Sequence, residues 1–189
     1  MIVIGITGTL GAGKGTVVNY LVEHKGYVHF SARGFIARII TRRGLEVNRD
    51  TLTAIGNEIR SNNHAGYVIE ALYNEAAATG KDCIIESVRT LGEVELLRSK
   101  SNFFLLAVDA EPRLRFERIM KRKSETDNVD FETFLANEKR EMHSSNPNNQ
   151  NLSACIAQAD FTVTNNGTIK NLESQIETFL KINLHDARP

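Results

Sequence analysis

The sequence lacks an excess of either charge. Its 189 residues include 23 Lys and Arg and 23 Asp and Glu, so the formal net charge is zero. Proteins that bind DNA or RNA usually carry a basic surface, and this composition therefore argues against a nucleic-acid partner. Any anionic ligand must be bound by a local group of positive charges.

Cysteine and histidine are scarce and not arranged for metal binding. The two cysteines, Cys83 and Cys155, are far apart, and the five histidines show no ligand spacing. Cys83 opens an apolar run, so we expect a buried, reduced thiol there. The pattern H-x-E…P-C-x-x-C of the zinc deaminases is also absent, which excludes deaminase activity.

Long apolar runs are missing too. The apolar start, Met1-Ile-Val-Ile-Gly, is far too short to span a bilayer, and it has neither a basic n-region nor a cleavage site. We therefore expect no membrane association and a cytoplasmic location.

Five short apolar runs predict five strands. They are Ile2–Ile6, Val28–Phe30, Cys83–Ile85, Phe103–Val108 and Phe161–Val163. The runs are nearly continuous rather than alternating, which is typical of strands buried on both faces of a parallel sheet. Helical patterns separate them, so we expect an α/β fold with a doubly wound, five-stranded parallel sheet in a single domain over residues 1–189.

The interval between the second and third predicted strands is unusually long. Residues 31–80 hold several helical stretches, with Asp50 as an expected N-cap and Gly80 as an expected helix stop. This pattern predicts an all-helical insertion that forms a substrate-binding lobe.

A glycine-rich loop follows the first predicted strand and precedes a helical pattern. The segment Gly8-Thr-Leu-Gly-Ala-Gly-Lys14-Gly-Thr16 fits G-x-x-x-x-G-K, the P-loop motif. Its glycines let backbone N–H groups form an anion site, the helix N-terminus adds positive charge, and Lys14 reaches the β- and γ-phosphates. The residues expected to bind a nucleoside triphosphate, most simply ATP, are Gly8, Gly11, Ala12, Gly13, Lys14, Gly15 and Thr16.

The loop departs from the motif at one position. Gly15 stands where a hydroxyl residue usually binds Mg²⁺, and the hydroxyl comes one place later, at Thr16. We therefore expect no direct metal cage: Mg²⁺, the expected cofactor, would be held by phosphates and water, with Thr16 or Glu86 as possible contributors.

The Gly-x-Gly-Lys-Gly-Thr form of the loop resembles that of adenylate kinase and other nucleoside monophosphate kinases. Over most of its length the chain is similar to an archaeal-type family of uncharacterised nucleotide kinases related to adenylate and dephospho-coenzyme A kinases. The resemblance includes Glu86-Ser-Val-Arg89, Arg115-Phe-Glu-Arg118 and Ala159–Gly167. It implies a P-loop kinase with small nucleotides as ligands.

Glu86 and Arg89 follow the third predicted strand, at the sheet edge where α/β proteins bind ligands. A carboxylate there can orient Mg²⁺-bound water, and an arginine can bind an acceptor phosphate with two hydrogen bonds. The monophosphate kinases have an Asp-Gly-x-Pro-Arg turn at this place, and the match here is partial. A surface ion pair is the alternative interpretation.

Arg115, Arg118 and Arg122 are spaced to share one helix face, opposite a predicted buried stripe that includes Ile119 and Met120. The row resembles the helix that enters the lid of adenylate-kinase-like enzymes, which implies a short lid region over residues 115–142. The resemblance assigns Arg118 and Arg122 to stabilising the moving phosphoryl group. A solvated basic face is the alternative.

Three further residues are candidates for binding the acceptor. In related kinases the helical insertion carries an arginine for the acceptor phosphate, which points to Arg38 or Arg60, and a Ser or Thr often follows the second strand, where Ser31 stands here. The arginines could equally be surface residues.

The acceptor class depends on whether the reaction needs a base. Transfer to a phosphate needs none, whereas transfer to a hydroxyl benefits from a carboxylate. Dephospho-coenzyme A kinases carry that acid after the second strand, but residues 31–45 here contain no acidic residue. This favours a nucleoside or deoxynucleoside monophosphate as the acceptor.

Two alternatives stay open. One is transfer to a ribose hydroxyl, as in dephospho-coenzyme A kinase, with Glu86 as the base. The other is a nucleotide sensor without catalysis, because the pattern also resembles a P-loop domain that accompanies deoxycytidylate deaminases.

Overall fold

The computed structural model describes residues 1–100, 102–122 and 129–184. Its strands are β1 (Val3–Gly8), β2 (Val28–Ser31), β3 (Cys83–Glu86), β4 (Phe103–Asp109) and β5 (Phe161–Thr164). Its helices are α1 (Lys14–Lys25), α2 (Ala32–Arg42), α3 (Arg49–Asn62), α4 (Tyr67–Thr79), α5 (Leu91–Arg98), α6 (Pro112–Arg122), α7 (Phe131–Met142), α8 (Leu152–Ala157) and α9 (Ile169–Leu184). None of the helices in these described ranges is long and apolar enough to cross a membrane.

The five strands form one parallel sheet in the order β2-β3-β1-β4-β5, which confirms the predicted doubly wound fold. The central strand β1 pairs with β3 on one side and β4 on the other, with Val3 opposite both Cys83 and Phe103. All the carboxyl ends therefore meet at one edge of the sheet, where ligands bind in open α/β folds.

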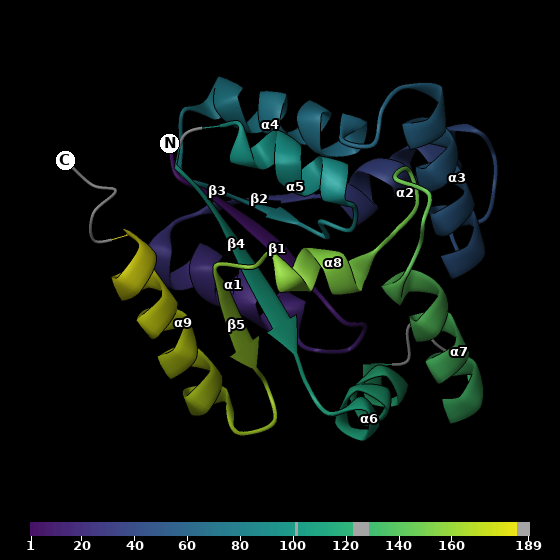
Figure 1. Cartoon of the computed structure of the whole chain (residues 1–189). Helices are drawn as coiled ribbons and strands as arrows, with labels where there is room; N and C mark the ends of the chain where they lie inside the picture. The colour runs from purple at the N-terminus through teal and green to yellow at the C-terminus, as the bar shows by residue number, and fades with distance from the viewer. Residues whose placement is uncertain (101, 123–128, 185–189) are drawn as a thin grey trace.

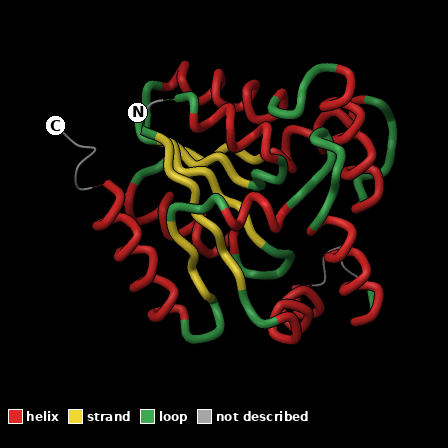
Figure 2. The backbone as a smooth tube through the Cα atoms, in the orientation of Figure 1, coloured by secondary structure: helices red, strands yellow, loops and turns green. Residues whose placement is uncertain are grey.

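Helices cover both faces of the sheet, and each face has its own apolar core (Figures 1 and 2). On one face, α1 and α9 pack residues such as Leu21 and Phe179 against Ile4 and Ile84. On the other face, α2 to α5 bury residues such as Ile40 and Leu72. Because both faces are buried at the centre of the sheet, β3 and β4 are nearly continuous apolar runs, and this is why they could be predicted from such runs, whereas the edge strands β2 and β5 alternate with polar residues such as His29 and Thr162.

The long interval between β2 and β3 folds as α2, α3 and α4. Gly80 ends α4 in a left-handed conformation, as predicted. The predicted N-cap of α3 was wrong: Asn48 caps this helix by accepting from the backbone N–H of Thr51, while Asp50 lies in the first turn. Asn48 and Thr51 complete a reciprocal capping box, which fixes the start of the helix at Asn48.

The helices α6 and α7 lie beyond the carboxyl edge of the sheet (Figure 1). The helix α6 packs through Arg115 and Ile119, which are both buried, whereas Met120 is 41% exposed. The predicted apolar stripe was therefore wrong at Met120, because Arg115 takes its place in the interface. Positions 123–128 of the predicted lid region lie outside the described residues.

Candidate active site

The P-loop connects β1 to α1 through three glycines with positive φ angles: Gly8, Gly11 and Gly13. A side chain at Gly8 would collide with the backbone of Val108, and one at Gly13 would collide with the amide of Asn165. Left-handed backbone and close neighbours both exclude larger residues here. The glycines thus bring the loop tightly against β4 and the turn after β5.

The departure at Gly15 is not caused by crowding. A Cβ atom added there would meet no atom within 4 Å. Thr16 is exposed and lines the cleft in front of the loop. The space for the usual hydroxyl is therefore present, and Thr16 lies within the same first turn of α1.

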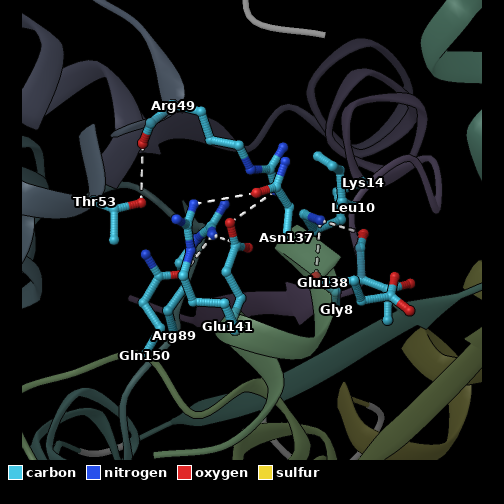
Figure 3. Close-up of polar contacts among 12 residues, drawn as sticks. Gly8, Leu10, Lys14, Arg49, Thr53, Arg89, Asn137, Glu138, Glu141 and Gln150 are labelled. Atoms are coloured by element: carbon cyan, nitrogen blue, oxygen red, sulfur yellow. Dashed lines mark hydrogen bonds and ion pairs between the residues drawn. The ribbon is translucent and has the colours of Figure 1, made fainter. Parts of the chain in front are cut away.

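Lys14 lies over the loop and is partly buried. Its Nζ donates hydrogen bonds to the carbonyl oxygens of Gly8, at 2.9 Å, and Thr9, at 2.7 Å (Figure 3). Burial, and next the positive charge of Arg89, lower the pKa of Lys14 to about 7. A triphosphate at the loop would supply the negative charge that favours the ammonium form.

This pKa leads to a testable expectation. At pH 8 Lys14 is largely neutral in the free protein, and binding of MgATP should charge it, so binding should take up about one proton per site. Calorimetry in buffers of different ionisation enthalpy measures this uptake. Lys14→Met removes the titrating group and should lower the uptake by the same amount. Equal proton uptake by both proteins would contradict a role for Lys14 at the phosphates.

Glu86 ends β3 and lines the same cleft as Lys14. Its Oε2 atom lies 3.1 Å from Nε2 of His29 on β2. Burial opposes ionisation of Glu86, but the hydrogen bond and charge of His29, with Lys14 and Arg89, outweigh burial and hold its pKa below the usual range. The next residue, Ser87, has a φ of 74°, a strained conformation of a kind that clusters at functional sites.

Arg89 lies within a cluster of polar side chains from four segments (Figure 3). Its Nη1 donates to Glu141 on α7, at 2.9 Å, and to Gln150, at 2.7 Å. The other carboxylate oxygen of Glu141 accepts from Nη2 of Arg49, at 2.8 Å. Arg89 is thus paired inside the molecule rather than at its outer surface.

The three arginines of α6 have different environments. Arg115 is 3% exposed, pairs with Glu138 of α7 and donates to the carbonyl oxygen of Leu10 in the P-loop. Arg118 and Arg122 both line the cleft in front of the P-loop. Arg118 donates through Nη2 to the carbonyl oxygen of Asn165, at 2.9 Å. Helix α6 therefore contacts the P-loop through Arg115, while Arg118 and Arg122 line the cleft.

A cleft of about 550 Å³ extends from the P-loop to the end of β3. The sequence-predicted residues that line it are Gly11, Gly13, Lys14, Gly15, Thr16, Glu86, Arg89, Arg118 and Arg122. A smaller pocket of about 70 Å³ continues toward α2 and α3, and the two spaces share Leu10, Arg33, Ser87 and Arg89. The structure thus places the P-loop and Arg89 around one continuous space.

Three residues that were predicted to bind the acceptor do not line the cleft in front of the P-loop. Arg38 is an exposed residue whose Nη2 lies 4.0 Å from Glu75, and it lines neither space. Ser31 caps α2 by accepting from the N–H of Gly34. Arg60 lines the smaller pocket, but its guanidinium is bound to Glu93, and both side chains are almost fully buried.

Sequence reasoning missed three residues of the polar cluster: Arg49, Glu141 and Gln150. Arg49 and Glu141 are 92 positions apart, so no local spacing could indicate their contact. The available signal was that Arg49 lies in the predicted insertion and Glu141 in the predicted lid region, whereas Gln150 lies in neither.

The fold and the P-loop together define the class: this is a P-loop protein with a kinase-like fold. The model of the AAA domain family matches residues 4–144, and the chain belongs to that family. It also belongs to the UPF0200 family: a UPF0200 protein of Methanocaldococcus jannaschii is 32% identical, and the match covers 96% of this chain and 90% of the relative.

Solved structures of kinases share the fold. Shikimate kinase from Bacteroides thetaiotaomicron aligns with a TM-score of 0.60 at 12% identity, covering 96% of this chain and 97% of the kinase. Dephospho-CoA kinase from Campylobacter jejuni aligns with a TM-score of 0.50 at 14% identity, covering 95% of this chain and 96% of the kinase. These likenesses confirm that the chain has the fold of P-loop kinases, and the archaeal relative confirms the resemblance to an archaeal-type family.

Proposed function

We propose that this protein transfers the γ-phosphoryl group of ATP to a nucleoside or deoxynucleoside monophosphate. One observation carries the proposal: a single cleft joins the P-loop lysine, Lys14, to Arg89 at the end of β3. A kinase must bind donor and acceptor phosphates side by side and in line, because positioning and charge stabilisation supply most of the rate of phosphoryl transfer.

The P-loop and Lys14 bind the β- and γ-phosphates in this proposal. The carboxylate of Glu86 is ionised and faces the cleft, so it can accept hydrogen bonds from water molecules bound to Mg²⁺. The described residues hold no group of three or more His, Cys, Asp or Glu side chains suited to a metal ion. The donor set therefore fits Mg²⁺ that arrives with ATP, bound by phosphates and water with Thr16 nearby.

Arg118 and Arg122 supply positive charge from α6 to the transferring group. Nη1 of Arg118 is buried, and within the described ranges no acceptor lies within hydrogen-bond distance of it. A buried donor without a partner is costly, and a phosphate oxygen in the cleft would satisfy it.

A monophosphate acceptor agrees with the residues after β2. This strand ends at Ser31 and is followed by α2, with no acidic side chain before residue 46. A phosphate oxygen is already ionised and needs no base. The second candidate, transfer to a ribose hydroxyl, is favoured by one observation: Glu86 is an ionised carboxylate in the cleft and could accept the proton.

Replacing Arg89 tests the acceptor site. In Arg89→Ala the KM for the acceptor should rise about tenfold or more, because a charge-assisted contact to its phosphate is lost, while the KM for ATP changes little. Steady-state kinetics with each substrate varied in turn measures both. Arg42→Ala, which removes an exposed arginine of α2, is the matched control. An unchanged acceptor KM in a folded Arg89→Ala variant would rule out this role.

A screen of acceptors distinguishes the candidate functions. ADP formation with MgATP is measured alone and with each common ribo- and deoxyribonucleoside monophosphate and with dephospho-coenzyme A. Strong stimulation by a monophosphate is the expected result, because water is excluded when the site closes on its substrate. Stimulation by dephospho-coenzyme A alone would favour the hydroxyl acceptor. No stimulation at all, with ATP binding retained, would favour a nucleotide sensor.

A further inference from the structure

The Glu141 carboxylate lies between two arginines that come from distant parts of the chain. Its Oε1 accepts from Arg49 of α3, and its Oε2 accepts from Arg89 after β3 (Figure 3). Glu141 itself belongs to α7, in the predicted lid region. The two arginines thus bind an anionic group, the carboxylate of Glu141, that belongs to the protein itself.

Glu141 is buried in this contact, whereas the two arginines remain partly exposed. The Glu141 side chain is 4% exposed, whereas Arg49 and Arg89 are 17% and 24% exposed. Burial opposes ionisation of Glu141, but the charges of Arg89 and Arg49 outweigh it and keep its pKa below the usual range. Glu141 is therefore a carboxylate at neutral pH, and the arginines remain accessible from the pocket.

One hydrogen-bond donor of this cluster has no acceptor among the described residues. Nε of Arg49 is buried, and among the described residues no acceptor lies within hydrogen-bond distance of it. A guanidinium can bind a tetrahedral anion through Nε and Nη2 together, whereas the carboxylate of Glu141 uses only Nη2. The cluster thus has more donors than Glu141 satisfies.

The pocket beside this pair is too small for a nucleotide. Its volume is about 70 Å³, and its apolar lining includes Ile36 and Leu52 of the helical insertion. Sites for small molecules commonly measure several hundred Å³. Glu141 lines this pocket, so its withdrawal would enlarge the space and uncover both arginines.

We propose that Arg49 and Arg89 together bind the phosphate of the acceptor, and that Glu141 occupies their site until the phosphate displaces it. The identification of the ligand as the acceptor rests on the proposed kinase function. Arg49 takes the place that the sequence suggested for Arg38 or Arg60. Glu141 acts as a specificity-determining residue.

The exchange selects for charge. When a carboxylate ligand displaces Glu141, one negative charge between the two arginines is exchanged for one other. A phosphate monoester dianion instead places two negative charges there. Displacing Glu141 is therefore favourable for a phosphate monoester and not for a carboxylic acid. The site should discriminate against acceptors whose only anionic group is a carboxylate.

Binding of inorganic phosphate tests the proposal without turnover. The P-loop is first filled with a non-hydrolysable ATP analogue and Mg²⁺, and phosphate is then titrated by calorimetry. Glu141→Gln should bind phosphate about tenfold tighter than the wild type, because the internal competitor has lost its charge. Adding Arg49→Ala to this variant should abolish the gain. Glu132→Gln, which removes a charge from an exposed position of α7, should leave the affinity within about twofold.

The wild-type protein provides a second test that does not depend on a variant's stability. It should bind phosphate but not acetate at the same concentrations, and Glu141→Gln should admit acetate as well. Equal binding of acetate and phosphate by the wild type, or an unchanged phosphate affinity in folded Glu141→Gln, would overturn the proposal. Because these titrations require no transfer, the anion site can fail while kinase activity is observed, or hold while kinase activity is absent.

Discussion

Lys14→Ala is expected to lower turnover by roughly a hundredfold or more while the protein stays folded. Lys14 lies at the P-loop, within hydrogen-bond distance of the carbonyl oxygens of Gly8 and Thr9, and it lines the cleft. As charge develops on the transferring phosphoryl group, the ammonium compensates it directly. Without it, the P-loop itself offers the phosphates no side-chain cation, and positive charge comes from Mg²⁺ and from Arg118 and Arg122 of α6.

The protein should stay folded after this substitution. Lys14 forms no ion pair with the described residues, and its surroundings lower its pKa to about 7, so truncation removes only the two hydrogen bonds to the carbonyl oxygens of Gly8 and Thr9. The rate is measured as ADP formation in the presence of the best acceptor, and folding by thermal unfolding. Lys81→Ala removes an exposed lysine and serves as the control. Full activity of a folded Lys14→Ala variant would remove the basis for phosphate binding at the loop.

Arg118→Ala is expected to lower kcat by about a hundredfold or more, with only a few-fold weaker binding of ATP. Arg118 is held by the carbonyl oxygen of Asn165, which itself binds the P-loop through the carbonyl oxygen of Ala12. This arrangement fixes the guanidinium at the cleft before any ligand arrives. Preorganised charge of this kind acts on the transition state more than on the bound substrate.

Single-turnover and equilibrium binding measurements separate the two effects. Lys121→Ala, on the same helix and exposed, removes one positive charge and should change kcat by less than about twofold. Arg122→Ala should also lower kcat, since Arg122 lines the same cleft. If Arg118→Ala changes ATP binding and kcat equally, or changes neither, Arg118 does not stabilise the transferring group.

The elements that could be predicted from sequence are those whose signal is local. Strands such as β1 and β4 are apolar because both faces of the sheet are covered, and the P-loop is one continuous motif. Gly80 could be predicted as a helix end because glycine adopts the left-handed backbone of this position more readily than other residues. In each case one short stretch of chain determines the conformation.

The features that escaped prediction depend on contacts between distant residues. Arg60 looked available for a ligand, but its partner Glu93 lies 33 positions further along the chain. Arg49 gave no signal by itself, because its contact with Glu141 exists only when α7 reaches the helical insertion. Even at α3, Asp50 and Asn48 were both acceptable caps by residue type, and the reciprocal bond with Thr51 decided between them.

The central claim, transfer of a phosphoryl group from ATP to a phosphate, is tested most directly by ³¹P NMR of the reaction mixture. With MgATP, the protein and the best monophosphate acceptor, we expect ADP together with a nucleoside diphosphate whose two phosphorus resonances are coupled. With Lys14→Ala the product should form about a hundredfold more slowly or less. A new phosphomonoester resonance would instead show transfer to a hydroxyl, and inorganic phosphate as the only product, or no product at all, would contradict the proposed kinase function.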